Sequence, residues 1–394
     1  MAKSMKKRYL IVLTDLNVGG VTTAAINLCN CLTEHGNFVD VLVMSSLRAS
    51  NEPDLGEQVN ILQLKGKDRL WNLNKQMIDS ENRPLAKFLL LCLGFIKKLI
   101  NTKSKWIRLL FGKKIRFSGY DMAIAYRQCA PCYHFVLNCV EATKKVGFVH
   151  GDINFMGDIS TWYRYMHDFD AIAYVSNAVK QGFINKHNDL TNNAITVYNV
   201  FDNDSIIQKS RIPCDFEFDK SVINIVTVSR IENDIKGTGR IPYICKMLKD
   251  SYKGQFHWYL VGDGPDMESL KQKIDSLSLS DHFTFVGQQS NPYNILVQAD
   301  MCIFPTFTEA FPMVVGEGLI LGVPIVTTRY PAVEEIIVDN YNGLIAEQSV
   351  ESIFEKLSCL FEDRNMLEQL KKNCSGYIYD NERSYNQLID VMIK

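Results

Sequence analysis

Short runs of apolar residues recur along this chain of 394 residues, and most of them are followed by a helical pattern. The runs at 9–13 and 222–228 contain no charged residue, which is typical of strands buried on both faces of a parallel sheet. The alternation of such strands with helices predicts a doubly wound, parallel α/β fold. The other expected strands lie at 38–44, 59–64, 122–126, 145–149, 171–175, 194–197, 256–261, 283–286, 292–298, 301–304 and 325–327.

The length and the strand pattern indicate two domains. A chain of 394 residues is long enough for two ordinary hydrophobic cores. The strand pattern stops near residue 200, passes through a polar and irregular stretch, and starts again at 222. We therefore expect an N-terminal domain at 1–200, a C-terminal domain at 201–378 and a final helix at 379–394.

The net charge of −1 conceals a difference between the two halves of the chain. Residues 1–200 contain 25 Lys and Arg against 16 Asp and Glu, whereas residues 201–394 contain 18 against 28. This asymmetry suggests that the first half faces an anionic partner. Nucleic acid is a poor candidate for that partner, because the acidic second half would repel a polyanion.

Residues 82–120 interrupt the alternation of strands and helices. This stretch contains ten Lys or Arg and no Asp or Glu, and its first part, 85–100, has apolar residues at helical spacing. The apolar core at 88–96 is too short to span a bilayer. We expect a basic amphipathic insertion that lies on anionic lipid headgroups. The alternative is a helical insertion that packs on its own domain, with its lysines simply solvated.

The stretch 304–345 contains two glutamates at a position where ligands commonly bind. Glu309 follows the expected strand at 301–304, and Glu317 lies about two turns into a helix that begins near Pro312. In open α/β sheets, ligands bind in the crevice outside the carboxyl ends of the strands. Spacing alone decides little, since pairs of glutamates are common on solvated helix faces.

The order of further elements in this stretch is more specific. The two glutamates are separated by seven residues and followed by Gly-Val-Pro at 322–324 and Asn-Gly at 342–343. This pattern resembles the donor-site signature of the retaining nucleotide-sugar glycosyltransferases of family 4, which have the GT-B fold. One departure is Ala310, where the family usually has glycine. The resemblance implies two Rossmann-like domains that face a central cleft, with the last helix crossing back to the N-terminal domain.

Two cations follow the first strand of the second domain. Arg230 ends the run at 222–228, and Lys236 is expected to open the next helix together with Gly237. A guanidinium offers a bidentate fork and an ammonium a point charge, so both suit a diphosphate. Gly262 and Gly287 follow the next two strands and match the nucleotide-side loops of the family.

Three residues of the first domain also follow strands. Gly19 and Gly20 lie between the first strand and its helix, where exposed amides suit a phosphate. His150 follows the expected strand at 145–149, and a lone histidine at such a place is usually structural. The resembled family places a histidine there near the reacting sugar, which favours a role for His150 in positioning that sugar.

The resemblance also implies a role for each matching residue. Glu309 would contact the donor sugar, in a pocket that includes Ala310, Phe311 and Pro312. Glu317 would accept hydrogen bonds from the ribose. Arg230 and Lys236 would stabilise the leaving diphosphate in place of a metal, so we expect neither a metal nor a cofactor.

These features predict a retaining, metal-independent hexosyltransferase that uses a nucleoside-diphosphate sugar, with UDP as the expected nucleotide. The expected acceptor is lipid-linked or a glycan, in bacterial cell-surface polysaccharide biosynthesis such as that of a capsule. The 11 scattered cysteines include two closely spaced pairs, Cys29 with Cys31 and Cys129 with Cys132, but no second pair at zinc-ligand spacing. We expect reduced thiols in a cytoplasmic protein that is peripheral on the inner face of the plasma membrane.

Two alternatives stay open. One is another nucleotide-sugar enzyme on the same scaffold, such as an epimerase, or a phosphorylase that would need a pyridoxal lysine. The other is a catalytically silent partner subunit that docks through the basic insertion. Turnover of a labelled donor, absent after Glu309→Ala, would distinguish an enzyme from a silent subunit.

Overall fold

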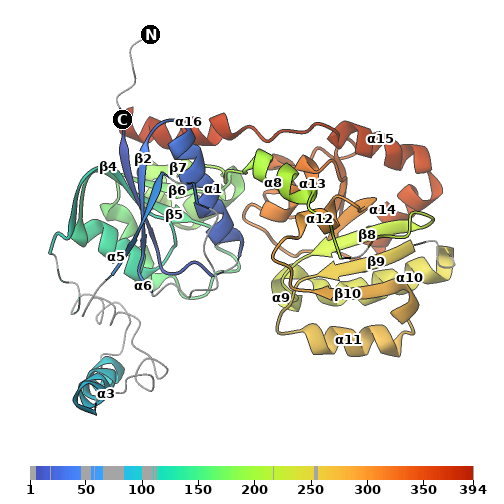
Figure 1. Cartoon of the computed structure of the whole chain (residues 1–394), viewed down its shortest axis with the longest axis horizontal. Coiled ribbons are helices and arrows are strands. Elements are labelled where there is room, and N and C mark those ends of the chain that lie inside the picture. Colours follow the sequence, from blue (N-terminus) through green and yellow to red (C-terminus); the bar gives the residue numbers. More distant parts are fainter. Residues whose placement is uncertain are drawn as a thin grey trace, which may run out of the picture. The chain divides into compact units, whose positions relative to one another are not determined.

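The computed structural model describes residues 6–17, 19–45, 55–56, 58–64, 84–99, 110, 112, 114–215, 217–252 and 256–393 (Figure 1). The chain divides into two compact units, each with its own parallel sheet. Unit 1 consists of Met1–Val175, Lys180–Val200 and Asn381–Lys394. Unit 2 consists of Ser176–Val179 and Phe201–Asp380.

Unit 1 is built on a seven-stranded sheet with the order β3-β2-β1-β4-β5-β6-β7. All neighbouring strands are parallel. The strand order reverses between β1 and β4, and such a switch point opens a crevice outside the carboxyl ends of the two strands. The strands are β1 (Arg8–Leu13), β2 (Phe38–Val43), β3 (Val59–Gln63), β4 (Phe117–Ala125), β5 (Val140–Val149), β6 (Ala171–Tyr174) and β7 (Ala194–Thr196).

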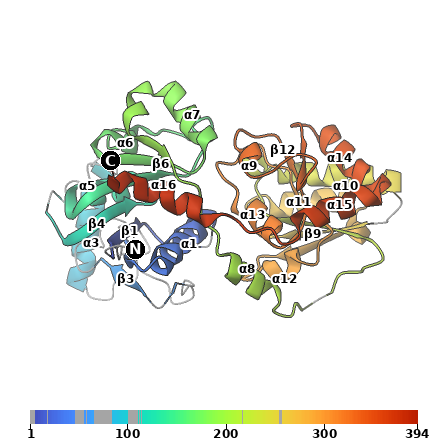
Figure 2. The ribbon, with the colours of Figure 1, turned by 90° about the horizontal axis from the view of Figure 1, so that it is seen from above.

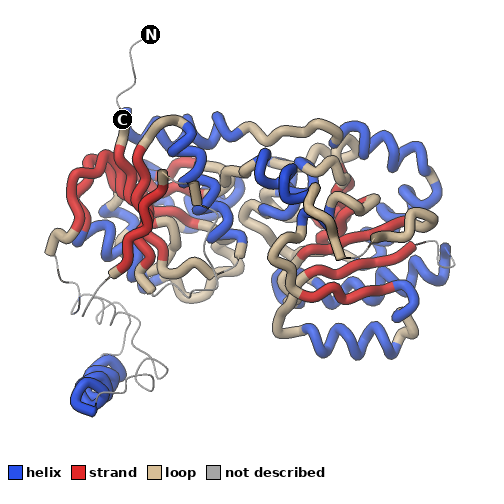
Figure 3. The backbone as a smooth tube through the Cα atoms, in the orientation of Figure 1, coloured by secondary structure: helices blue, strands red, loops and turns tan. Residues whose placement is uncertain are grey.

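The helices of the first half of the chain lie mostly between consecutive strands, as the alternating pattern predicts. The helix after β1 packs against β2, and the helix after β4 packs against both β4 and β5, so these two connections cover the sheet (Figure 3). They are α1 (Gly20–Glu34), α3 (Pro84–Leu99), α5 (Ala130–Cys139), α6 (Ser160–Tyr163) and α7 (Asn177–Lys186).

The last helix of the chain, α16 (Asn381–Ile393), belongs to unit 1 and lies beside α1 (Figure 2). The His35 ring, at the end of α1, stacks on Tyr385 with 3.6 Å between ring centroids. The imidazole Nε2 of His35 is 2.9 Å from the Glu382 carboxylate. Leu388 is fully buried, so the last helix of the chain contributes to the hydrophobic core of unit 1.

Unit 2 repeats the arrangement with six parallel strands in the order β10-β9-β8-β11-β12-β13. Its switch point lies between β8 and β11, which pair directly. The strands are β8 (Ile223–Val228), β9 (Phe256–Val261), β10 (Phe283–Gly287), β11 (Met301–Phe304), β12 (Ile325–Thr328) and β13 (Gly343–Ala346). The helices are α8 (Asn203–Ser210), α9 (Asn233–Lys236), α10 (Ile241–Tyr252), α11 (Met267–Ser276), α12 (Tyr293–Leu296), α13 (Met313–Ile320), α14 (Val350–Glu362) and α15 (Arg364–Cys374).

A buried chain of hydrogen bonds ties the three central strands of unit 2 together. The indole N–H of Trp258 on β9 donates to the Thr227 hydroxyl on β8 at 3.2 Å. That hydroxyl in turn donates to the Ile303 carbonyl on β11 at 2.7 Å. Buried polar groups are costly unless paired, and this chain pairs each of its members at the centre of the sheet.

The predicted doubly wound α/β class is confirmed, and the strands differ from expectation in four places. Strands β4 and β5 begin earlier than predicted, and β13 was not predicted at all. The prediction of sheet structure at 292–298 is wrong. Tyr293–Leu296 form a short helix instead, because Pro292 caps its start and a polar stretch precedes it.

Helix α3 covers most of the first part of the basic insertion. Its large apolar side chains are exposed: Leu85, Phe88, Leu89, Leu91, Phe95 and Ile96 have exposed fractions between 41% and 73%. The second apolar part predicted at 106–111 lies outside the described residues except for position 110. Within the described ranges, no helix combines the length and the apolar character that crossing a membrane requires.

Candidate active site

The predicted site residues fall into two groups, one in each unit. Gly19, Gly20 and His150 belong to unit 1. The others belong to unit 2 and are Arg230, Lys236, Gly262, Gly287, Glu309, Ala310, Phe311, Pro312 and Glu317. In unit 2 they follow β8, β9, β10 and β11, so they gather at the carboxyl edge of the sheet, around its switch point.

The closest contact in this group is an ion pair between Lys236 and Glu309. The Lys236 ammonium lies 2.5 Å from the Glu309 carboxylate, and both side chains are largely buried, with exposed fractions of 29% and 16%. The Thr306 hydroxyl also lies 3.3 Å from the same carboxylate oxygen. The loop after β8 and the loop after β11 are therefore joined by their charged side chains.

The backbone around Lys236 differs from the prediction that this residue opens a helix. Lys236 ends the single turn of α9, and Gly237 terminates that turn with a left-handed φ of +62°. A Cβ atom at Gly237 would lie 2.0 Å from the Pro305 carbonyl oxygen. Glycine is required here both by its conformation and by the close approach of the loop that carries Glu309.

Two residues that were not predicted from the sequence, Arg240 and Gln348, hold the Glu309 loop in place. The Arg240 guanidinium donates to the carbonyl of Pro305 and to the side chain of Gln348, and it lies 4.0 Å from the centroid of the Phe307 ring. Burial lowers the pKa of Arg240 to about 10. The Gln348 amide donates to the carbonyls of Thr306 and Phe307, both at 3.2 Å. The only sequence signal for Arg240 is its place four residues after Lys236.

Glu317 lies on α13 and is buried, with an exposed fraction of 8%. Burial raises the pKa of Glu317 to about 7, and the hydrogen bond from Tyr293 opposes this rise. The Tyr293 hydroxyl donates to the carboxylate at 3.1 Å. Tyr293 is a further residue that the sequence analysis missed, because it lies in the segment predicted as a strand. Glu317 thus titrates near neutral pH.

Arg230 and two glycines complete the edge of unit 2. Arg230 follows β8 with a largely exposed side chain, and its guanidinium lies 3.7 Å from the Glu232 carboxylate. A Cβ atom at Gly262 would lie 2.0 Å from the Ser229 carbonyl oxygen, so glycine allows the loops after β8 and β9 to touch. The Gly262 amide donates to the Gly287 carbonyl at 2.9 Å, which extends the contact to β10.

The residues between Glu309 and α13 are small or apolar. Ala310 is partly exposed, whereas Phe311 and Pro312 are buried. Pro312 is the N-cap residue of α13, and the prediction of a helix start near this position is confirmed. The Phe311 ring packs near Phe201, with 6.3 Å between ring centroids. Phe311 therefore anchors the loop rather than offering a polar group.

In unit 1, Gly19 and Gly20 lie where β1 leads into α1. Gly19 is the N-cap residue and Gly20 is the first residue of the helix. A Cβ atom at Gly19 would meet no atom within 4 Å. This part of the loop is therefore open, and the N-terminal amides of a 15-residue helix point toward it.

His150 is held as a neutral imidazole at the end of β5. Its Nε2 lies 2.6 Å from the Tyr126 carbonyl oxygen, which can only accept, so Nε2 carries the proton. The His150 amide donates to the side chain of Gln128 at 3.2 Å. Burial lowers the pKa of His150 to about 4. At neutral pH the ring therefore presents Nδ1 as an acceptor rather than a positive charge.

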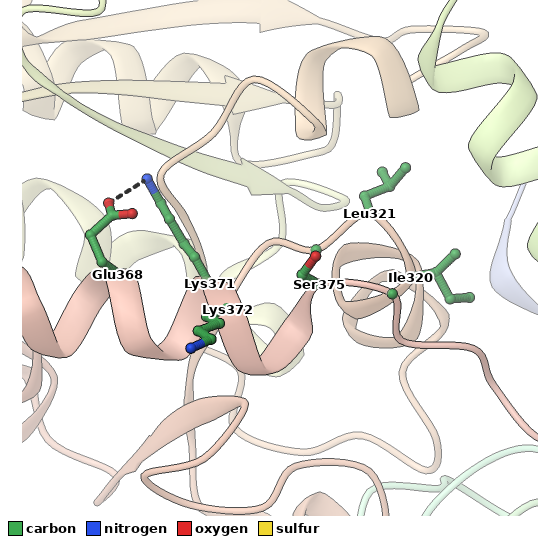
Figure 4. Close-up of a pocket in the computed structure, with 8 residues that line it drawn as sticks. Ile320, Leu321, Glu368, Lys371, Lys372 and Ser375 are labelled. Atoms are coloured by element: carbon green, nitrogen blue, oxygen red, sulfur yellow. Dashed lines mark hydrogen bonds and ion pairs between the residues drawn. The ribbon is translucent and has the colours of Figure 1, made fainter.

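A shallow groove in unit 2 lies at the other end of α13, away from Glu309 (Figure 4). It is lined by Ile320, Leu321, Gly322, Glu368, Lys371, Lys372, Ser375 and Gly376. The Lys371 ammonium lies 2.6 Å from Asp300 and 3.4 Å from Glu368, so its charge is already balanced by neighbouring carboxylates. We assign no function to this groove.

Comparisons with known proteins bear on the fold of the chain and on the family that residues 209–375 match. The family described as "Glycosyl transferases group 1" matches residues 209–375. A crystal structure of TarM from S. aureus, in complex with UDP and other ligands, superposes with a TM-score of 0.72 at 11% identity and covers 98% of this chain and 100% of that one. The chain shares the fold of this solved structure, and its residues 209–375 match the glycosyltransferase family. The resemblance and the fold predicted from the sequence are thereby confirmed.

Curated relatives match this chain over part of their length. N-acetyl-alpha-D-glucosaminyl L-malate synthase from Bacillus anthracis is 24% identical over 259 residues, which is 62% of this chain and 65% of the relative. A Campylobacter jejuni N,N'-diacetylbacillosaminyl-diphospho-undecaprenol alpha-1,3-N-acetylgalactosaminyltransferase is 29% identical over 165 residues, or 40% and 42% of the two chains. The match thus spans less than two thirds of either relative.

The close approach at Gly237 yields a prediction about the stability of unit 2. We expect Gly237→Ala to lower the free energy of unfolding of unit 2 by roughly 1–3 kcal/mol more than Gly376→Ala does. Both glycines have positive φ, but a Cβ atom at Gly376 would meet nothing within 4 Å. Hydrogen exchange of peptides from β8 and β11 at increasing urea measures the difference. Equal losses in the two variants would contradict the proposed contact with Pro305.

The environment of Glu317 yields a pH prediction. Its pKa in the folded chain lies above the ordinary value, so the folded state keeps a proton that the unfolded state loses. Its contribution to stability is therefore fully present at low pH and is lost as pH rises from about 4.5 to about 7. Tyr293→Phe should move the end of this loss to higher pH, since Tyr293 favours the charged form.

A carboxyl ¹³C titration measures the midpoint directly. Glu317→Gln identifies the resonance, because that signal must vanish in the variant. An unchanged or lower midpoint in Tyr293→Phe would contradict the role given to the hydrogen bond.

Proposed function

We propose that this chain is a retaining, metal-independent hexosyltransferase that takes a sugar from a UDP-linked donor. The proposed acceptor is lipid-linked or a glycan, in bacterial cell-surface polysaccharide biosynthesis. The observation that carries the proposal is the contact between Lys236 and Glu309 at the switch point of unit 2. It brings together a cation for the leaving group and a carboxylate for the sugar.

The Lys236 ammonium can contact Glu309 and a diphosphate at the same time. An ammonium has three N–H donors, and one of them is used by Glu309 in this structure. The remaining donors can bind diphosphate oxygens, while the exposed guanidinium of Arg230 after the neighbouring strand supplies a second, bidentate cation. Fixed positive charge beside the leaving group lowers the barrier, because negative charge develops there as the glycosidic bond breaks.

The two glutamates would share the donor between them. Glu309 retains a second carboxylate oxygen, which could accept hydrogen bonds from sugar hydroxyls. Glu317, oriented by Tyr293, would accept from the ribose hydroxyls. His150 would offer its neutral Nδ1 to a sugar hydroxyl, since its Nε2 proton is already donated to Tyr126.

The comparisons support the choice of donor and acceptor class. Among similar solved structures, TarM is in complex with UDP and HepE from Anabaena with UDP-glucose. The Campylobacter relative is named for an acceptor with a diphospho-undecaprenol, which is a lipid-linked sugar. These are properties of those proteins, and we extend the same classes of ligand to this chain as part of the proposal.

We further propose that α3 attaches the enzyme to an anionic membrane surface. Six exposed apolar side chains on one 16-residue helix form a larger apolar surface than a soluble unit ordinarily leaves uncovered. The surrounding sequence, 82–120, is free of acidic residues and carries ten basic ones. Such a combination suits the boundary between acyl chains and anionic headgroups, on the inner face of the plasma membrane.

The donor site can be tested by thermal shift with UDP, GDP, ADP and CMP. We expect UDP to raise the melting temperature without added magnesium, because a ligand that binds only the folded state stabilises it. Arg230→Ala and Lys236→Ala should each weaken UDP binding about 10- to 100-fold, since each removes a charge-assisted hydrogen bond worth roughly 1.5–3 kcal/mol. Lys246→Ala is the matched control, because Lys246 pairs with Asp250 on α10.

The outcome also separates the candidate functions. The donor site is supported if Arg230→Ala and Lys236→Ala both lose UDP binding while Lys246→Ala binds UDP like wild type. No shift with any nucleotide, or equal shifts in all four proteins, would contradict it and favour the silent partner subunit.

The membrane role can be tested by vesicle flotation. We expect wild type to float with vesicles of phosphatidylglycerol and not with phosphatidylcholine alone. Replacing Phe88 and Phe95 by Asp should reduce that binding at least about tenfold, because each phenylalanine contributes roughly 1.5–3 kcal/mol when buried. Val338→Asp is the control, since Val338 is similarly exposed in unit 2. Unchanged flotation of the double variant would contradict the proposal.

A further inference from the structure

The loop after β4 carries a pair of cysteines that the proposed reaction does not use. The sequence there is Cys129-Ala130-Pro131-Cys132. Cys129 is the N-cap residue of α5, and Cys132 lies in the first turn of that helix. Cys129 is partly exposed, whereas Cys132 is fully buried. The Cys129 thiol is therefore accessible to solvent, whereas the Cys132 thiol is not.

The geometry of this turn suits a bond between the two sulfur atoms. The Cys132 thiol is in hydrogen-bonding contact with the Cys129 thiol. Residues three apart at the start of a helix lie on the same side, and a disulfide spans Cα atoms about 4.4–6.8 Å apart. Pro131 is tolerated in the first turn, where its missing N–H leaves no acceptor unpaired. The spacing of the pair at the start of α5 therefore suits an internal disulfide.

The environments of the two thiols give them different roles. Cys129 is the accessible thiol of the two, so it is the one that reacts with an external partner. Burial, followed by its contact with Cys129, raises the pKa of the Cys132 thiol. A buried thiol of this kind does not react with solvent, but it can attack a sulfur held next to it.

Two plainer explanations of the pair are less complete. As apolar filling, the two would resemble the other buried cysteines, but Cys129 is accessible and contacts a second thiol. As metal ligands, they would need further donors, and no group of three or more His, Cys, Asp or Glu suited to a metal occurs in the described part of the chain. The Cys132 sulfur instead lies 4.0 Å from the sulfur of Met44.

The cysteine pair lies at the carboxyl edge of the unit 1 sheet, where the switch point between β1 and β4 is. Strand β4 is the neighbour of β1 at the switch point, so the loop with Cys129 lies at the same edge as the loop with Gly19. Gln128 directly precedes Cys129, and its side chain accepts the hydrogen bond from the His150 amide. A change in the backbone at Cys129 would therefore reach the residue that supports His150.

We propose that Cys129 and Cys132 form a reversible disulfide by exchange with a low-molecular-weight disulfide such as oxidised glutathione. The Cys129 thiolate attacks one sulfur of that disulfide, whose S–S bond breaks and releases one thiol. The Cys132 thiolate then attacks the Cys129 sulfur in the mixed disulfide and releases the second thiol. Two protein thiols are oxidised and one small disulfide is reduced to two thiols, which take up the two protons. This inference does not depend on the proposed function.

The test is to equilibrate the full-length protein in buffers with a series of reduced-to-oxidised glutathione ratios. Free thiols are then blocked under denaturing conditions, and the peptide with residues 129–132 is analysed by mass spectrometry. We expect an internal disulfide to appear at oxidising ratios and to disappear again at reducing ones. Cys132→Ser should instead accumulate glutathione on Cys129, because no second thiol can release it. Cys359→Ser, which removes an exposed cysteine elsewhere, should behave like wild type.

Two results would overturn the inference. One is a wild-type peptide in which both thiols remain blocked at every ratio. The other is wild type that accumulates glutathione on Cys129 as Cys132→Ser does, without closing the internal bond.

The effect of the disulfide on His150, through Gln128, is measured separately. The ring signals of ¹³C-labelled His150 should shift between the reduced and oxidised forms of wild type, with no such shift in a Cys129→Ser, Cys132→Ser double variant. Identical His150 spectra in the two forms of wild type would overturn this part.

Discussion

The contact between Lys236 and Glu309 is the interaction on which the account of unit 2 depends. It forms because the strand order reverses between β8 and β11, which places the loops after these two strands next to each other. Gly237 makes the approach sterically possible, and Arg240 supports the loop from beneath through the Pro305 carbonyl. A charged pair held on such a scaffold is positioned before any ligand arrives, which is what electrostatic catalysis requires.

Burial sets the charge state of one predicted site residue in each unit. Glu317 is buried beside Tyr293 and titrates near neutral pH, so a modest change in its surroundings decides whether it is charged. In unit 1, burial keeps His150 neutral, and its Nε2 proton is committed to Tyr126. Each group is therefore suited to accept hydrogen bonds from hydroxyls, and neither adds a positive charge. In the proposed donor site the positive charge comes from Arg230 and Lys236.

The sequence predicted most of the sheet because its strands are short, apolar and buried on both faces, a pattern that few other structures produce. It failed at 292–298, where a proline-capped turn of helix has the same apolar content as a strand. The helix start expected at Lys236 was wrong because Gly237 adopts a positive φ that ends a turn. Arg240 and Gln348 escaped notice because their contact joins residues 108 positions apart, which no local pattern reveals.

The most direct test of the account is turnover of a UDP-sugar by wild type and by Glu309→Gln, with the anomeric configuration of the product read by NMR. Wild type is expected to release UDP only with transfer or hydrolysis of the sugar, and the product is expected to retain the configuration of the donor. Glu309→Gln should bind UDP nearly as well as wild type but turn over at least about 100-fold more slowly, because it keeps the shape of the loop and loses the carboxylate. Equal turnover by the two proteins, or inversion at the anomeric carbon, would contradict it.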